Sequence, residues 1–318
     1  MVLYRFPFET KFYTALDTDG VPAISFFPFD AGRSLAFCGP MEEIQQTELP
    51  RFSPHRLSEI NLTASESKAD YLTTISETID FVKEHQLPKL VISRRKKLYY
   101  QSVDLSATFL NLCEAYPNAF VYVFLKDGIC WAGAFSEVLG KFNKKSGEFE
   151  TMSLAGTLPV NLSWGEKEME EQKPVTDFIL KILRQYSGEV YQSATFDHIS
   201  GNIKHLRTDF KAKIHPDQLD TLISELHPTP AVCGIPTPFC KNAIKTFEKK
   251  SREFYAGYIK VESGDHVFYF VNLRCAQFYK NGAELYVGGG ITEKSNPQKE
   301  WQETELKAEA VLKNLATS

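Results

Sequence analysis

The chain has 318 residues, of which 43% are apolar and 24% charged, and its formal net charge is -4. This composition is typical of a globular protein with a sizeable core, and the acidic balance argues against nucleic acid as the main partner. Six scattered cysteines without a C-x-x-C pair indicate a reducing compartment and no zinc site, and no segment approaches the ~18 apolar residues of a membrane span, so we expect a cytoplasmic protein.

The first hundred residues are predicted to hold short strands and one amphipathic helix. Residues 1–60 are irregular, with aromatic-rich pieces that resemble strands. A helix is predicted beyond them, with Ser65 as its N-cap, because apolar side chains recur at helical spacing. These side chains are Leu72, Ile75, Ile79 and Val82. A short apolar strand at 90–92 follows, and the basic run at 94–97 is interpreted as a solvated loop, since no aromatic stacking platform surrounds it.

The remaining elements alternate between hairpins and groups of helices. A helix is indicated by Leu105, Phe109 and Leu112, and the turn signals Asp127-Gly128 and Ser146-Gly147 separate β-rich segments. Further helices are expected at about 172–187, 215–226, 240–250 and 299–315, and further strands at 255–261, 266–273 and 284–287. Strands that cluster in hairpins predict an α+β fold with large antiparallel sheets rather than a βαβ repeat. No Pro-, Gly- or Ser-rich linker divides the chain, so one domain is expected.

The segment that follows Gly288-Gly289-Gly290 gives the clearest indication of chemistry. If the chain is helical from residue 300 onward, Glu300, Glu303 and Lys307 lie on one face. Two carboxylates one turn apart suit a hard cation such as Mg²⁺, and a lysine one turn further on can hold an anion that the metal also touches. The glycines offer backbone N–H groups where a side chain would block approach. Taken alone, the same pattern is more often a solvated helix with Glu–Lys pairs.

Two residues are candidates for a base and an acid. Lys89 begins the buried strand, where a lysine commonly extends its ammonium group to solvent. A lysine buried at that position can instead accept a proton near neutral pH. Glu137 follows the return strand of the first hairpin, either as a charge that protects a sheet edge or as a general acid whose pKa is raised by an apolar site.

Several further segments carry candidate binding residues. Gly156 ends a run of small and apolar residues, where a ligand or another backbone could approach closely. The acidic run at 167–172 suits the start of a helix, and one of its carboxylates could equally bind a metal.

A rigid loop and two arginines complete the inventory. Two prolines and a glycine in the loop 227–234 indicate a positioned pocket wall beside His227, although a lone histidine is most often structural. Arg252 and Arg274 each lie beside strand residues and need an anion there, supplied by a protein carboxylate or by a ligand. Together these residues favour Mg²⁺-assisted chemistry on a small anionic molecule, without identifying that molecule.

Read in chain order from about residue 65 to the C-terminus, these motifs resemble the chorismate-utilising enzymes, which include isochorismate, anthranilate, aminodeoxychorismate and salicylate synthases. The resemblance implies a single α+β domain of two large, mainly antiparallel sheets packed together with helices outside. Residues 1–64 would form a reduced N-terminal region packed on that domain, and residues 65–318 the catalytic region. The His-Pro-Thr-Pro-Ala-Val run at 227–232 is similar to the isochorismate synthase version, since ammonia-using members typically carry Gly-Thr at Pro230-Ala231. Lys89 matches the lysine with which isochorismate and salicylate synthases activate water.

The resemblance also implies a mechanism. Mg²⁺ would be held by Glu171 and Glu303, with Glu300 acting through water, and would bind the C1 carboxylate of chorismate. Lys89 would take a proton from the water that attacks C2, and Glu137 would protonate the departing C4 hydroxyl. The residues expected to contact the substrate are Gly156, Thr157, His227, Ala231, Tyr255, Arg274, Gly288, Gly290 and Lys307.

The chain departs from the family pattern at Gln172, where a histidine usually follows the metal carboxylate, and at Ser136, which replaces the usual proline before the acid. We expect an isochorismate synthase that acts as a monomer, without a glutaminase partner, nucleic acid or membrane. The alternatives are a salicylate synthase, which adds pyruvate elimination, an anthranilate or aminodeoxychorismate synthase, and a non-catalytic chorismate-binding protein. Menaquinone and siderophore pathways both begin with isochorismate, so the sequence does not choose between them.

Overall fold

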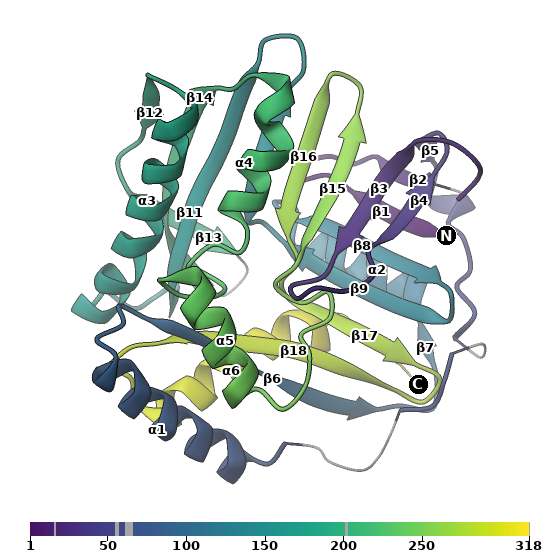
Figure 1. Cartoon of the computed structure of the whole chain (residues 1–318). Coiled ribbons are helices and arrows are strands. Elements are labelled where there is room, and N and C mark those ends of the chain that lie inside the picture. Colours follow the sequence, from purple (N-terminus) through teal and green to yellow (C-terminus); the bar gives the residue numbers. More distant parts are fainter. Residues whose placement is uncertain (16, 55–56, 61–65, 201–202, 318) are drawn as a thin grey trace.

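The computed structural model describes residues 1–15, 17–54, 57–60, 66–200 and 203–317. In this part of the chain the strands form two large antiparallel sheets and one short two-stranded ladder, and the helices lie outside the sheets (Figure 1). The α+β fold of large antiparallel sheets that the sequence predicts is therefore confirmed.

The strand orders explain how distant segments meet. The eight-stranded sheet has the order β5 (Glu42–Ile44), β2 (Phe12–Ala15), β1 (Val2–Arg5), β8 (Phe120–Lys126), β9 (Ile129–Phe135), β17 (Cys275–Tyr279), β18 (Gly282–Ile291), β6 (Leu90–Tyr99). The nine-stranded sheet has the order β12 (Val190–Gln192), β14 (Ile203–Lys213), β11 (Glu148–Pro159), β10 (Val138–Asn143), β16 (His266–Val271), β15 (Tyr258–Ser263), β3 (Pro22–Phe27), β4 (Leu35–Cys38), with β13 (Phe196–Ser200) also paired to β14. The short ladder joins β7 (Val103–Asp104) to β19 (Ala316–Thr317).

The N-terminal strands belong to both large sheets. β1 pairs with β8 in the first sheet, and β3 pairs with β15 in the second. The N-terminal region therefore supplies strands to both sheets, and strands from later parts of the chain pair with them.

The helices are α1 (Lys68–Glu84), α2 (Leu105–Ala115), α3 (Glu166–Tyr186), α4 (Leu219–Leu226), α5 (Thr237–Phe247) and α6 (Pro297–Leu312). The predicted helices are confirmed, with ends shifted by a few residues. Ser67 caps α1 by accepting the Asp70 N–H at 3.1 Å, whereas the predicted cap Ser65 lies outside the described residues. None of the helices in the described ranges is both long and apolar enough to cross a membrane.

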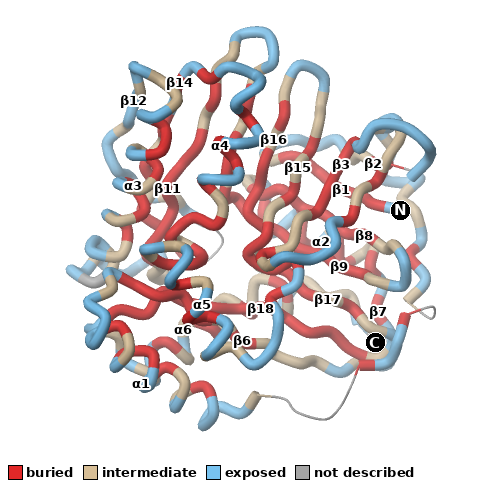
Figure 2. Tube along the Cα trace, viewed as in Figure 1, coloured by how far each residue is buried: buried red, intermediate tan, exposed pale blue. Residues whose placement is uncertain are grey.

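The hydrophobic core has two parts, which lie on opposite faces of the eight-stranded sheet. Side chains alternate along β8, so that Phe120, Tyr122 and Phe124 face the cluster between the sheets. Val121 and Val123 face a second cluster, shared with α2 and α6. Figure 2 shows the resulting pattern, with buried residues along the middle of the strands and exposed residues at the hairpin ends.

The basic run at 94–97 was predicted to be a solvated loop, and this prediction was wrong. β6 continues through it, and Arg94 is only 4% exposed. The Arg94 guanidinium stacks 3.8 Å from the ring centroid of Trp301, donates to Thr304 at 2.9 Å and pairs with Glu305. These three partners on α6 compensate the cost of burying the Arg94 charge, which the basic neighbours in the sequence had suggested would be solvated.

Candidate active site

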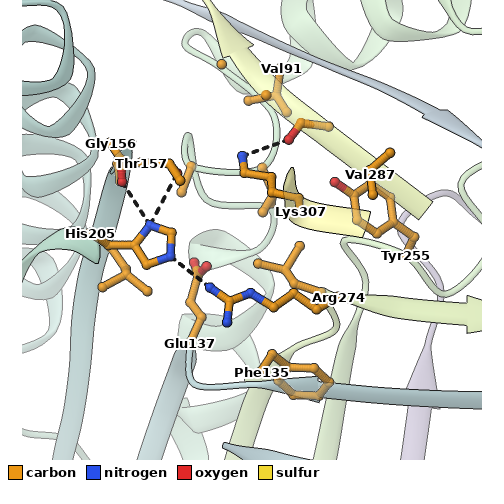
Figure 3. Close-up of a pocket in the computed structure, with 18 of the residues that line it drawn as sticks. Val91, Phe135, Glu137, Gly156, Thr157, His205, Tyr255, Arg274, Val287 and Lys307 are labelled. Atoms are coloured by element: carbon orange, nitrogen blue, oxygen red, sulfur yellow. Dashed lines mark hydrogen bonds between the residues drawn. The ribbon is translucent and has the colours of Figure 1, made fainter. Parts of the chain in front are cut away.

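A pocket of about 810 Å³, part of it open to solvent, lies where the two sheets meet α3 and α6. Its walls come from the β9–β10 connection, β11, β14, the loop before α5, the connection from β16 to β17, and the glycine-rich end of β18. Figure 3 shows the central side chains converging on this space. Most of the predicted substrate residues line it: Gly156, Thr157, Ala231, Tyr255, Arg274, Gly288, Gly290 and Lys307, together with Glu137 and Glu171.

The glycine strand presents backbone groups to the pocket. Gly288 and Gly290 of β18 stand opposite Ser93 and Val91 of β6. The Ser93 and Val91 N–H groups donate elsewhere, to Glu248 and to the Cys233 carbonyl, so they point away from β18. Each of these two pairs is therefore a non-hydrogen-bonded pair of the antiparallel ladder. In such a pair the N–H and C=O groups of both residues point away from the opposite strand. The N–H and C=O groups of Gly288 and Gly290 therefore point away from β6.

The edge toward which those groups point is open. β17 pairs with β18 only as far as Tyr286, which stands opposite Cys275. Beyond Tyr286 the Lys307 ammonium donates to the Gly288 carbonyl at 2.8 Å (Figure 3). This contact agrees with a Gly288 carbonyl that points away from β6. The backbone N–H groups predicted to hold an anion are thus available on this side.

Two glycines also make room for carboxylates. A Cβ on Gly290 would lie 2.5 Å from Glu171 Oε1, and a Cβ on Gly289 would lie 3.2 Å from Glu300 Oε2 and 3.4 Å from Glu303 Oε1. A residue with a side chain would collide with, or crowd, these oxygens. Glycine is required here so that α3 and α6 can bring acidic groups against the strand from its two faces.

Lys89 lies immediately behind this wall. It is fully buried, and its Nζ lies 2.9 Å from Glu171 Oε1. Because Lys89 precedes β6 and Glu171 lies on α3, the tertiary structure alone creates this ion pair. Lys89 does not itself line the pocket, but it contacts a residue that does.

Glu137 is the second titratable group at the site. It follows β9 in the turn to β10, and only 5% of its surface is exposed. Burial raises its pKa to about 7, although the charges of Lys89, Arg274 and Lys307 act in the opposite direction. At neutral pH a large fraction of this carboxyl group is therefore protonated, as a general acid requires.

His205 on β14 is a site residue that the sequence did not reveal. Its Nε2 accepts a hydrogen bond from the Arg274 guanidinium at 2.9 Å, so Nδ1 carries the proton that is donated to the Gly156 carbonyl at 2.8 Å (Figure 3). Burial and the nearby Arg274 charge hold the pKa of His205 well below its usual value. A neutral histidine thus orients Arg274 in the pocket. The alternation of apolar and polar residues along 203–213 could have predicted the strand. However, no helix or strand is predicted from the sequence between residues 187 and 215.

His227 does not reach the pocket, contrary to its predicted contact with the substrate. Its Nε2–H donates to the Ala256 carbonyl at 2.9 Å, and its ring packs against Phe29 and Tyr258. Burial lowers its pKa to about 4. The ring anchors the loop, while Ala231 further along the same loop lines the pocket.

The two departures from the family pattern both have local partners. Gln172 Nε2 donates to Ser153, Thr176 and Thr208 at 2.7–3.1 Å, which ties α3 to β11 and β14. Ser136 shares a hydrogen bond of 2.8 Å with His198 of β13. Gln172 thus holds the helix that carries Glu171 rather than facing the pocket.

The predicted metal ligands all approach the glycine strand, Glu171 from one face and Glu300 and Glu303 from the other. Glu171, Glu300 and Glu303 all approach Gly289-Gly290, and carboxylate oxygens are the ligands that Mg²⁺ prefers. In the described residues no three His, Cys, Asp or Glu side chains are grouped closely enough to hold a metal as they stand. Instead Lys89 pairs with Glu171, and Lys307 lies 2.8 Å from Glu303 Oε1. Carboxylate oxygens are thus present as donors for a hard cation, and in this structure Lys89 and Lys307 compensate two of the carboxylates.

Comparison with known proteins places the chain in a family. Isochorismate synthase EntC of Escherichia coli is 29% identical over 245 residues, which cover 71% of this chain and 62% of that protein. The structure superimposes on MenF, the menaquinone-specific isochorismate synthase from Escherichia coli, with a TM-score of 0.78 at 20% identity, over 98% of this chain and 88% of that one. Anthranilate synthase component I from Streptococcus pneumoniae gives a TM-score of 0.69 at 20% identity, over 80% and 60%.

Both solved structures share the fold, so the fold does not separate the isochorismate and anthranilate branches. The chain spans about three-fifths of the length of the curated relative. A family model described as "Chorismate binding enzyme" matches residues 38–316, nearly the whole chain. The protein is therefore a member of the chorismate-binding enzyme family.

Proposed function

We propose that this protein is an isochorismate synthase, which converts chorismate reversibly into isochorismate. The observation that carries the proposal is the combination of buried Lys89, which reaches the pocket through Glu171, with Glu137, whose pKa of about 7 suits a proton donor. The names of the curated relatives support the same reaction. We expect the protein to act on chorismate without a glutaminase partner.

The residues would divide the work as follows. Arg274, Lys307 and the outward N–H groups of Gly288 and Gly290 would hold the substrate carboxylates. Lys89, as the neutral amine, would take a proton from water, whose oxygen bonds to C2. The ring double bonds shift, the C4–O bond breaks, and Glu137 protonates the leaving hydroxyl as water. Each proton transfer of this kind typically contributes ~10²–10⁴ in rate.

Mg²⁺ is proposed as the cofactor, with Glu171 and Glu303 as ligands and Glu300 acting through water. When bound, it would neutralise the substrate carboxylate and draw charge from the ring. The carboxylates around Gly289-Gly290 support this choice, because they are hard oxygen donors.

Replacing Glu303 by glutamine is expected to weaken Mg²⁺ binding by about 10–100-fold, in line with the loss of a metal-supporting group. Titration of the full chain with MgCl₂ in a calorimeter, without chorismate, measures this directly. Glu309→Gln is the matched control, since Glu309 lies on the same helix but pairs with Lys313. Equal Mg²⁺ affinities in both variants would remove Glu303 from the ligand set.

Gly290→Ala is expected to reduce kcat/KM by about 10²-fold, the effect of a displacement near 1 Å at a reacting group. The added Cβ would lie 2.5 Å from Glu171 Oε1 and 3.0 Å from Lys89 Cε, so the ion pair must move. Gly188→Ala is the control, because a Cβ there meets no atom within 4 Å. Steady-state kinetics of both variants at saturating Mg²⁺ test this, and unchanged kinetics in Gly290→Ala would contradict the close fit.

The reaction itself is tested by product analysis. The full chain is incubated with chorismate and Mg²⁺, with and without ammonium, and the products are separated by chromatography. Isochorismate formed without ammonium supports the proposal, whereas salicylate plus pyruvate indicates a salicylate synthase. An ammonium-dependent aminated product would assign the chain to the amination branch, and no turnover would favour a chorismate-binding protein without activity.

A further inference from the structure

Two histidines stand opposite each other beside the active-site pocket. β13 pairs with β14 so that His198 faces His205 directly across the ladder, and burial and nearby arginine charges lower the pKa of both. His205 orients Arg274, and Figure 3 shows this arginine beside Glu137. The proposed reaction gives His198 no role, although its partner Ser136 lines the same pocket.

The hydrogen-bond partners of His198 fix which ring nitrogen carries its proton. The Arg207 guanidinium lies 3.4 Å from Nδ1, and a guanidinium can only donate, so Nδ1 accepts. Burial, followed by the charges of Arg207 and Arg274, lowers the pKa of His198 to about 4, so the ring is neutral near pH 7. The single ring proton is therefore on Nε2 and is donated to Ser136 Oγ at 2.8 Å. Arg207 is in turn held by Asp209 at 2.6 Å.

The hydroxyl group of Ser136 keeps its own proton for another partner. A serine hydroxyl has one proton to donate and two acceptor positions, and His198 uses an acceptor position. Within the described ranges of the chain, Ser136 Oγ has no hydrogen bond other than the one from His198. Ser136 is only 8% exposed and lines the pocket beside Glu137. Because a buried donor without an acceptor costs free energy, a ligand that offers an oxygen at this place in the pocket is favoured.

The neighbouring acid indicates which substrate oxygen this donor meets. Glu137 follows Ser136 directly in the chain and lines the same pocket, and in the proposed function it protonates the C4 hydroxyl group. The oxygen of that hydroxyl group has two lone pairs, of which Glu137 can use only one. A second donor on the other lone pair would stabilise the negative charge that develops on this oxygen as the C4–O bond breaks.

We propose that the Ser136 hydroxyl, oriented by His198, donates a hydrogen bond to the C4 hydroxyl oxygen of chorismate. Ser136 is then a further catalytic residue, since it touches a reacting atom, and His198 is a positioning residue that acts through Ser136. The inference rests on the proposed function for the place of the C4 hydroxyl group, and it adds a second donor from the β9–β10 connection.

The contact is tested by calorimetric titration of the full chain with two ligands in the presence of Mg²⁺. Chorismate carries the C4 hydroxyl group, whereas 3-(1-carboxyvinyloxy)benzoate carries the same two carboxylates without it. Glu137→Gln is the parent protein, so that chorismate is consumed only slowly during the titration. Adding Ser136→Ala should weaken chorismate binding by about tenfold, the effect of one lost hydrogen bond in a buried site, and leave binding of the benzoate unchanged. Unchanged chorismate binding, or an equal loss for both ligands as a purely structural role would give, overturns the proposal.

Steady-state kinetics test whether His198 acts through Ser136. In the otherwise wild-type chain, Ser136→Ala and His198→Phe should each lower kcat/KM for chorismate by about 10²-fold, because the donor is lost where charge develops. The double variant should lose no more than either single variant, since both remove the same contact. His198→Gln should retain most of the rate, because its side-chain amide can donate from a position close to that of Nε2. Wild-type kinetics in His198→Phe would remove His198 from the positioning role.

Two matched controls remove similar hydrogen bonds outside the pocket. Ser106 donates to the Pro50 carbonyl at 2.6 Å, and the ring of His266 lies 3.2 Å from the Asn143 side-chain amide. Neither residue lines the pocket, so Ser106→Ala and His266→Phe should leave kcat/KM unchanged.

This inference and the proposed function fail in different ways. A wild-type product other than isochorismate, or no product, contradicts the proposed function, and the titration still decides whether Ser136 contacts the C4 hydroxyl group. Wild-type kcat/KM in Ser136→Ala, in a chain that forms isochorismate, overturns the Ser136 contact alone.

Discussion

Replacing Lys89 by methionine is expected to reduce kcat for isochorismate formation by about 10²–10⁴-fold, the usual contribution of a general base. Methionine fills a similar volume in the fully buried position but cannot accept a proton. The loss should appear in kcat more than in KM, because Lys89 lies behind the pocket wall and does not line it. Steady-state kinetics with chorismate and saturating Mg²⁺ measure the effect.

A loss of activity must be separated from a loss of structure, since Lys89→Met also removes the partner of Glu171. Thermal melting and near-ultraviolet circular dichroism report on folding. Lys126→Met is the control, because Lys126 is largely though not fully buried and pairs with Asp17 at 2.7 Å, away from the pocket. Near-normal turnover by a folded Lys89→Met protein would exclude Lys89 as the base.

Glu137→Gln is the second substitution with a large expected effect, again a decrease of about 10²–10⁴-fold in kcat. The wild-type rate should fall as the pH rises through about 7, because the carboxyl group loses the proton that it must donate. Glutamine cannot donate in this way, so the variant's residual rate should lack this step in its pH profile. A wild-type profile without a limb near pH 7 would contradict the assignment.

The same substitution has an expected effect on stability, with a defined sign. Glu137 has a pKa of about 7 in the folded protein against an ordinary value of 4.5, so the folded state holds its proton more tightly between these values. Its contribution to stability is therefore lost as the pH rises through this window, by up to about 3 kcal/mol. Glu137→Gln should exceed the wild type in free energy of unfolding at pH 8 but not at pH 5.

Urea unfolding of the metal-free proteins at the two pH values tests this difference. Glu150→Gln serves as the control, since Glu150 is a partly exposed carboxylate on β11 with loose ion pairs at 3.6–3.9 Å. A pH-independent difference between wild type and Glu137→Gln would indicate that Glu137 is ionised throughout and does not act as an acid.

Much of the architecture could be predicted from local patterns. The Asp127-Gly128 turn has positive φ at both residues, 51° and 74°, as the tight hairpin turn between β8 and β9 requires. The apolar spacing in α1 and the acidic start of α3 likewise reflect periodicity and the helix dipole, which depend on neighbours in sequence. Such features were predictable because their physical causes lie within a few residues.

Two of the failed predictions share a different cause. Arg94 reads as solvated because its neighbours are basic, yet Trp301 and Glu305, more than 200 residues away, bury and neutralise it. The family resemblance implies that His227 contacts the substrate, but its ring donates to the Ala256 carbonyl and does not line the pocket. The strand carrying His205 was not predicted at all. For Arg94 and His227 the deciding partner lies outside the local segment, whereas the strand at 203–213 has a local pattern that would have predicted it.

The sequence by itself determined the family, the α+β class and the identities of the candidate base, acid and metal carboxylates, since these depend on residue type and order. Only the tertiary structure decided that Lys89 pairs with Glu171, that Arg274 is oriented by a neutral His205, and that Gly288 and Gly290 turn their N–H groups to an open edge. Burial, ion pairing and strand register are properties of contacts between distant segments, and they set which of the predicted groups can act together.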